Sequence, residues 1–150
     1  MPYKMSYFNC VEVIFMKVFI VVLVTYFLVV VIKLIGFLIS SKKKTFKSIF
    51  RNSFGNGNFP SSHNAIMSAL TTSIFFETGV SWGFSLSFWL MLIIMSDSFN
   101  TRGAISKNSI TLNKLTKSKI HDERVGHSWI EIFAGLVLGL IISCISYLIF

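Results

Sequence analysis

The chain has 150 residues, of which 53% are hydrophobic and only 13% are charged. Soluble domains carry about 25% charged residues, so this composition excludes an ordinary soluble domain and predicts one integral membrane domain over residues 1–150. The net charge of +8 does not indicate nucleic-acid binding, because most basic residues fall in two segments that are separated by apolar stretches. Such segments are typical of cytoplasmic loops, and they favour membrane lipids as neighbours.

The first predicted element is an apolar helix over residues 13–39. About 20 apolar residues cross a bilayer as a helix, so this segment is long enough to span. Lys33 lies in its last third, where a lysine either extends to the membrane surface or serves a site. The basic segment 40–62, which contains Arg51 and Pro60, is predicted to be a loop because it is rich in glycine, asparagine and charge.

Two shorter apolar segments, 63–78 and 82–96, predict a helical hairpin that turns at Gly79. Ser61 or Ser62 is suited to cap the first of these helices, since serine is a favoured residue at helix starts. Each helix is shorter than an ideal membrane span at about 1.5 Å per residue. The hairpin is therefore predicted to be tilted or to lie partly inside the protein.

The polar and basic segment 97–128 is predicted to be a second loop, with a partly amphipathic helix on the membrane surface. The apolar segment 129–150 is long enough to span, and Gly135 and Gly139 form a G-x-x-x-G pair that predicts close packing between helices. The predicted fold is thus an all-α membrane bundle of about four transmembrane helices, which could form a homo-oligomer.

Membrane topology places two histidines on one face. If both basic loops are cytoplasmic, the helices 63–78 and 129–150 begin on the same side, and His63 and His127 lie at their starts. Glu131 follows His127 by four residues, which places both on one helix face. Its carboxylate can therefore hold the imidazole in one tautomer or stabilise its cation.

These residues together predict an anion site. Histidines, a carboxylate, cations and the free N–H groups of helix starts suit a phosphate or an oxyanion. The candidate cations are Lys33, Arg51, Arg102 and Arg124. Taken singly, each feature has an ordinary structural interpretation, such as a capped helix start or a side chain among lipid headgroups. The motifs of serine hydrolases, zinc proteases and P-loop nucleotide-binding proteins are missing from the sequence, and no metal or other cofactor is expected.

The order of PSSH, SDSFNTR, TLNKL and GHSWIEIFAG resembles a family of small membrane proteins. They are described as divergent members of the type 2 phosphatidic acid phosphatase superfamily, which is related to acid phosphatases and vanadium-dependent haloperoxidases. The resemblance runs from about Val29 to the C-terminus. It implies a minimal helical core of that type, with the inner (plasma) membrane of a bacterium as the location.

The resemblance also implies roles for individual residues. In the wider superfamily, the histidine of the third motif attacks phosphorus, an aspartate orients it, and the histidine of the second motif protonates the leaving oxygen. By resemblance, His127 is the nucleophile, Glu131 its partner and His63 the general acid. The residues implied to bind phosphate are Ser61, Ser62, Lys33, Arg51 and Arg102.

The chain departs from the superfamily pattern at several positions. Ser62 stands where the superfamily has glycine, and Glu131 stands where it has aspartate. His121 occupies the position of the third-motif arginine, and the first motif is not clearly present.

The leading hypothesis is a membrane phosphatase that hydrolyses a phosphomonoester or pyrophosphate, with lipid phosphates among the candidates, at the cytoplasmic face. One alternative is an inactive member that binds phosphate or an anionic headgroup or serves a membrane assembly. Another is a lipid or anion transporter.

Overall fold

The computed structural model describes residues 3–40 and 59–149. All regular elements in these ranges are helices, which confirms the predicted all-α fold. They are α1 (Tyr3–Ser40), α3 (Ser62–Thr78), α4 (Trp82–Ser96), the π-helical turn η1 (Asp97–Thr101), α5 (Arg102–Leu115) and α6 (Trp129–Ile149).

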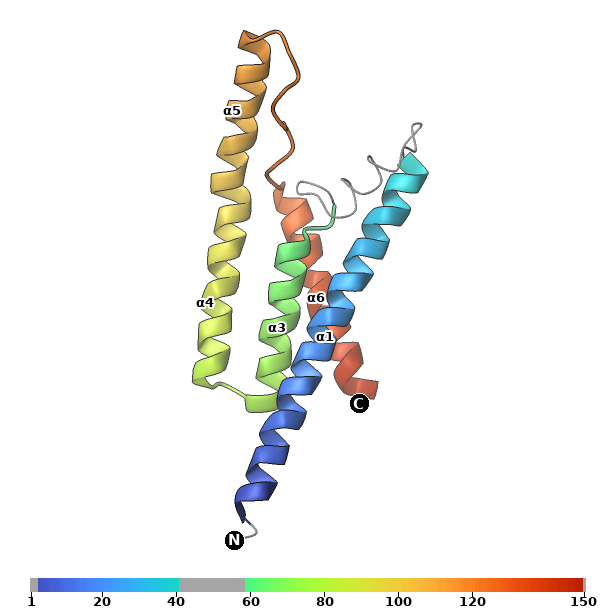
Figure 1. Cartoon of the computed structure of the whole chain (residues 1–150), viewed down its shortest axis with the longest axis vertical. Helices are drawn as coiled ribbons and strands as arrows, with labels where there is room; N and C mark the ends of the chain where they lie inside the picture. Colours follow the sequence, from blue (N-terminus) through green and yellow to red (C-terminus); the bar gives the residue numbers. More distant parts are fainter. Residues whose placement is uncertain (1–2, 41–58, 150) are drawn as a thin grey trace.

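Three helical segments are long and apolar enough to cross a membrane, namely Glu12–Ile39, Trp82–Leu115 and Trp129–Ile149. The helix α3 has 17 residues and is the fourth, shorter helix of the bundle. It lies between the others and contacts α1, α4 and α6 (Figure 1). The predicted helix at 63–78 is confirmed, but three helices rather than four have the length and apolarity of a span.

Small residues explain how α3 fits among its neighbours. A Cβ added at Gly135 of α6 would overlap the carbonyl oxygen of Ser61, and one added at Gly139 would overlap that of Ala65. The two helix backbones therefore touch, as the G-x-x-x-G pair predicts. Hydroxyl groups join the same interface: Ser68 Oγ donates to Leu136 O at 2.7 Å. This contact fixes the start of α3 against the first turns of α6.

The packing face of α1 repeats every four residues. Val21, Thr25, Val29 and Lys33 are all buried, and this spacing places them on one side of the helix. Between Val13 and Ile39, the other side of α1 is mostly apolar and exposed, as expected for a helix in contact with lipid. The helix begins at Tyr3, and its candidate membrane span, Glu12–Ile39, agrees with the predicted apolar segment 13–39.

Residues 97–128 are not all loop, and the amphipathic helix predicted within this segment is part of α5. The chain stays helical from α4 through η1 and α5 to Leu115, and only residues 116–128 form a loop. Polar residues in this stretch do not break the helix, because their hydroxyl groups bond to carbonyls one turn back. Ser98 Oγ donates to Ile94 O at 2.8 Å, and Thr111 Oγ1 donates to Lys107 O at 3.0 Å.

The continuous helix from α4 to α5 extends beyond the rest of the bundle (Figure 1). Its 34 residues measure about 50 Å at about 1.5 Å per residue. A bilayer core is about 30 Å thick, so α5 extends past the hydrocarbon layer and carries its basic residues outside it.

The loop 116–128 returns along α5 toward the bundle (Figure 1). Asn113 Nδ2 donates to His121 O at 2.8 Å and to Glu123 Oε1 at 2.9 Å. Further along, Ser106 Oγ accepts from Gly126 N at 2.9 Å, and Gly126 lies directly against the backbone of Gly103. These contacts guide the chain back to the point where α4, η1 and α6 meet.

Candidate functional site

His127 is held at the start of α6 by two hydrogen bonds. Its main-chain N–H donates to Ser98 O of η1 at 3.2 Å, and its ring Nδ1 lies 3.2 Å from Glu131 Oε2. The side chain is only 1% exposed. Because Nδ1 faces a carboxylate, this nitrogen carries the proton in the neutral ring, and Nε2 keeps the free lone pair.

Glu131 also forms the cap of α6. Its Oε2 accepts from Ser128 N at 2.9 Å, and its own N–H lies 3.4 Å from Ser128 Oγ. This reciprocal pair is a capping box. The other carboxylate oxygen lies 3.7 Å from Arg124 Nη2. The carboxylate that orients His127 is thus itself fixed by the local geometry of the helix start.

His63 lies in the first turn of α3 and is half-buried. The preceding Ser61 donates its N–H to Glu131 O at 3.1 Å. The following residue, Asn64, is fully buried, and its Nδ2 donates to Ser61 Oγ at 2.9 Å and to Ser98 Oγ at 3.2 Å. These bonds bring the PSSHN segment to the same end of the bundle as His127.

Cations lie beside both histidines. His63 interacts electrostatically with Arg102, with Lys33 and with His127. Lys33 is only 5% exposed and interacts with Glu131. Arg102 Nε donates to Asp97 Oδ2 at 2.7 Å.

We call this group the histidine end; it comprises Lys33, His63, Asp97, Arg102, Arg124, His127 and Glu131. Its three cations against two carboxylates give an excess of positive charge that suits an anion.

Burial sets the protonation state of His127. Removal from water lowers the pKa of its imidazole below the ordinary value of 6.5, and the positive charges of Lys33 and Arg102 lower it further. The hydrogen bond and the charge of Glu131 act in the opposite direction but do not prevail. The ring is therefore neutral near pH 7, which is the form in which Nε2 can act as a nucleophile.

The structure brings together most of the predicted site residues but not all of them. Ser61 holds the position of the cap before α3, yet its hydroxyl bonds to Asn64 rather than to a main-chain N–H. Ser62 begins α3 and is half-buried. Arg51 lies outside the described residues. His121 is exposed and is bonded to Asn113 on α5.

Sequence reasoning missed two residues of the site. Asn64 and Ser98 are fully buried polar residues that join the PSSHN segment to η1. Both belong to the motif regions noted above, since Asn64 directly follows PSSH and Ser98 is part of SDSFNTR. A polar residue that cannot reach water needs partners, so their position in apolar surroundings was the available signal. Asp97, in the same SDSFNTR motif, pairs with Arg102.

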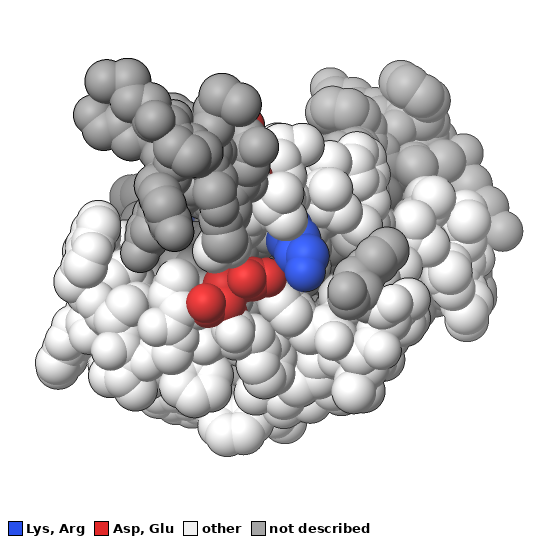
Figure 2. Space-filling model, turned by 90° about the horizontal axis from the view of Figure 1, so that it is seen from below, with Lys and Arg blue, Asp and Glu red and all other residues white. Residues whose placement is uncertain are grey.

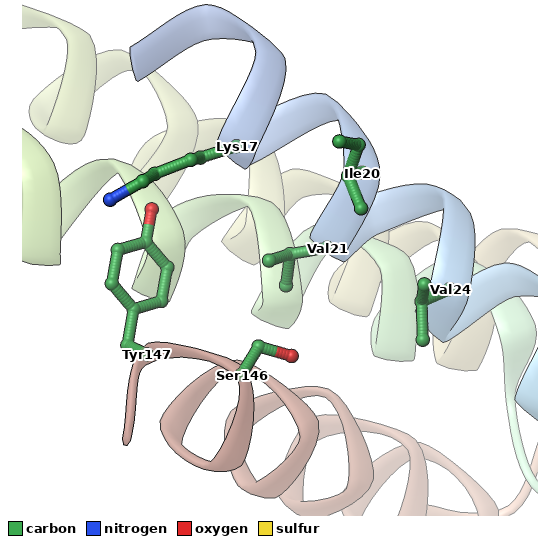
Figure 3. A pocket seen from close by; sticks show the side chains of 6 residues that line it. All are labelled: Lys17, Ile20, Val21, Val24, Ser146 and Tyr147. Carbon is green, nitrogen blue, oxygen red and sulfur yellow. The ribbon is translucent and has the colours of Figure 1, made fainter. Parts of the chain in front are cut away.

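The opposite end of the bundle differs. Viewed from that end, the coloured surface shows few charged atoms, with acidic and basic groups next to each other (Figure 2). A cavity of about 240 Å³ lies there between α1 and α6. It is lined mainly by apolar side chains, and Lys17 points toward Tyr147 at one edge (Figure 3). The cavity holds none of the predicted site residues.

Comparison with known protein families agrees with the motifs and the helical site. The family model described as the Divergent PAP2 family matches residues 15–142. The chain belongs to this family. Membership of the Divergent PAP2 family confirms the resemblance suggested by PSSH and GHSWIE, and together with the three candidate spans it identifies an integral membrane protein. No curated protein and no solved structure matches the chain.

Proposed function

We propose that this Divergent PAP2 protein is a membrane phosphatase that hydrolyses a phosphomonoester or pyrophosphate through a phosphohistidine intermediate. One observation carries the proposal: the buried His127 has its Nδ1 directed at Glu131, at 3.2 Å, beside His63 and a surplus of cations. This arrangement is what an oriented nucleophile, an acid and an anion site require. Lipid phosphates are candidate substrates, because Lys33 lies within a candidate span.

In the first half-reaction, His127 Nε2 attacks phosphorus while the bond from phosphorus to the leaving oxygen breaks. His63 gives its proton to that oxygen, and Glu131 stabilises the positive charge that develops on the His127 ring. A bound phosphate dianion favours the protonated form of His63, because opposite charges stabilise each other. Lys33 and Arg102 stabilise the phosphoryl oxygens, which is the main source of catalysis in phosphoryl transfer.

In the second half-reaction, water attacks the phosphohistidine. His63, now neutral, accepts a proton from that water, and the bond from phosphorus to Nε2 breaks. Its electron pair returns to His127, and inorganic phosphate leaves. Both residues are then ready for another cycle, so the reaction consumes only the substrate and one water.

The test is phosphate release by the purified protein from lipid phosphates, soluble phosphomonoesters and pyrophosphate. His127→Ala is expected to reduce the rate by about 10³-fold or more, because the nucleophile is lost. Quenching the wild-type reaction with labelled substrate should trap an acid-labile phosphohistidine. Release that survives in His127→Ala would contradict the proposal.

The role of His63 has its own test. His63→Ala is expected to slow phosphohistidine formation from alkyl phosphates strongly, but to slow the same first step much less with p-nitrophenyl phosphate, whose leaving group needs no proton. Equal losses on both substrates would show that His63 is not the general acid.

A second candidate function is phosphate or headgroup binding without turnover. The close bond between Arg102 and Asp97, at 2.7 Å, favours it, because a carboxylate on the arginine weakens the charge available to a transition state. The same preparation distinguishes the two functions. Binding of phosphate or vanadate without any phosphate release would support the second.

For the orientation, we propose that the histidine end faces the cytoplasm. Basic residues gather on the part of the chain that extends beyond this end: Lys107, Lys114, Lys117, Lys119 and Arg124. Positively charged segments favour the cytoplasmic side of membranes. Labelling of a cysteine introduced at exposed Lys119, with a reagent that does not cross the membrane, should occur only in opened cells or inverted vesicles. Labelling in intact cells would reverse the orientation.

A further inference from the structure

The turn η1 interrupts regular α-helical bonding where the helix passes the site. The N–H of Arg102 donates to Asp97 O, five residues back, instead of to Ser98 O, four residues back as in an α-helix. Ser98 O instead accepts the main-chain N–H of His127 at 3.2 Å. Turns of this type within α-helices occur frequently at functional sites. Here, the turn supplies a main-chain acceptor to the segment that carries His127.

The side chain of Ser98 makes a second connection. It is fully buried, and its hydroxyl proton is donated to Ile94 O at 2.8 Å. The oxygen therefore acts as an acceptor toward Asn64 Nδ2, at 3.2 Å. Since Asn64 directly follows His63, this bond joins η1 to the first turn of α3.

We propose that Ser98 is a positioning residue that sets the separation of His63 and His127. Its carbonyl holds the segment of one histidine and its hydroxyl holds the segment of the other. The catalytic meaning of this role rests on the function proposed above. Ser98 acts through its neighbours, in the same way that supporting residues hold reacting groups in other enzymes.

The packing around η1 supports this role. The ring of Phe99 in η1 packs at a tilt of 32° against that of Trp129, the first residue of α6, with centroids 4.3 Å apart. The turn thus touches α6 on both sides of Ser128. A shift of about 1 Å between reacting groups costs on the order of 10²-fold in rate, so loosening this junction is expected to affect turnover more than substrate binding.

The first experiment compares Ser98→Ala with Ser87→Ala. Ser87 is a matched control, because it is also buried in the helix and its hydroxyl also bonds within the helix, to Phe84 O at 2.9 Å. Ser98→Ala is expected to lower kcat by roughly 10-fold to 100-fold with little change in KM. Ser87→Ala should stay within about twofold, at a similar thermal midpoint. A kcat for Ser98→Ala within twofold of wild type would overturn the proposal.

A double-mutant cycle tests the path from Ser98 to Asn64. If Ser98 acts through Asn64, the variant with both Ser98→Ala and Asn64→Ala should be no slower than Asn64→Ala alone. Additive losses in kcat would show that the two residues act independently, which contradicts the proposal.

A third experiment needs no substrate and tests the carbonyl contact. Deleting Asn100 should convert η1 into a regular α-helical turn, whereas Asn100→Ala keeps the residue count. The His127 amide is expected to exchange with deuterium at least about tenfold faster in the deletion variant. Unchanged exchange in a folded deletion variant would refute the role of the turn. If the deletion variant does not fold, the double-mutant cycle of Ser98 and Asn64 tests the proposal.

The outcomes separate the two proposals. If the wild type neither binds nor hydrolyses phosphate, the proposed function fails. The double-mutant cycle of Ser98→Ala and Asn64→Ala is then measured by thermal stability instead of kcat. Together with the deuterium exchange, it still tests whether Ser98 joins the two segments.

Discussion

Lys17 and Glu77, at one end of the bundle, lie 3.9 Å apart and balance each other's charge. Tyr147 beside them donates to Ser73 O at 3.3 Å, so the cluster links α1, α3 and α6. At the histidine end, similar residue types are arranged differently, because its cations outnumber its carboxylates. A balanced cluster stabilises helix packing, whereas a cluster with surplus positive charge is left to attract an anion.

Removing Arg102 should have the largest effect on the histidine end. Arg102→Ala takes away a cation near both histidines and leaves Asp97 without its partner, so kcat/KM is expected to fall by about 10²-fold to 10³-fold. Arg124→Ala is the control, because that side chain is 71% exposed, and its loss should cost only a few-fold. Equal effects of the two variants in a phosphate-release assay would remove Arg102 from the site.

Replacing Lys33 should weaken anion binding without weakening the fold. Lys33→Met keeps the length of the side chain and removes a buried charge, which is itself costly to bury. We expect vanadate to bind on the order of tenfold more weakly and the thermal midpoint to stay equal or rise. A lower midpoint with unchanged vanadate binding would assign Lys33 a structural role like that of Lys17.

The pH dependence should follow the neutral form of His127. Because its pKa is lowered below 6.5, the nucleophile is available at neutral pH, and kcat/KM should fall about tenfold per pH unit below that lowered pKa. Since Glu131 raises this pKa, Glu131→Gln should move the acid limb to lower pH. Movement to higher pH would contradict the assignment. The free energy of unfolding should also decline as pH falls below 6.5, because the unfolded state then binds a proton at this histidine more readily than the folded state does.

The smallest effect is expected at the opposite end. Lys17→Met leaves the carboxylate of Glu77 without its lysine, but Lys17 is 42% exposed, so the loss of stability should be at most about 1 kcal/mol. Phosphate release and vanadate binding should remain at wild-type levels. A strong loss of activity without unfolding would mean that the two ends are coupled.

Helix positions were predictable where composition is apolar, and the placement of His63 and His127 at one end of the bundle was predictable from the order of the helices. Both histidines lie at the starts of α3 and α6, which begin at the same end of the bundle (Figure 1). The sequence predicted that Glu131 faces His127, but it did not predict that Glu131 also caps α6. The helices 63–78 and 82–96 begin and end close to where their flanking residues predict.

Within the stretch 97–115, the sequence indicated an amphipathic helix, but it did not indicate that the chain stays helical without a break from α4. Polar and basic residues favour a loop when they are considered alone, but hydrogen bonds back along the helix satisfy them. The turn η1 is stabilised by the bond between Ser98 and His127, which are far apart in the sequence. The position of Arg102 follows from that turn, so neither was accessible without the fold.

The close contact of α3 with Gly135 and Gly139 has a consequence for biosynthesis. Four buried residues of α3 are polar: Asn64, Ser68, Thr71 and Ser73. A short helix with such residues gains little by entering lipid alone, and the hydroxyl groups of Ser68 and Ser73 find partners on α6, namely Leu136 O and Ser143 Oγ. Since α6 follows α3 in the chain, α3 gains these partners only after α6 has been made. A nascent chain that still lacks α6 therefore holds no assembled histidine end.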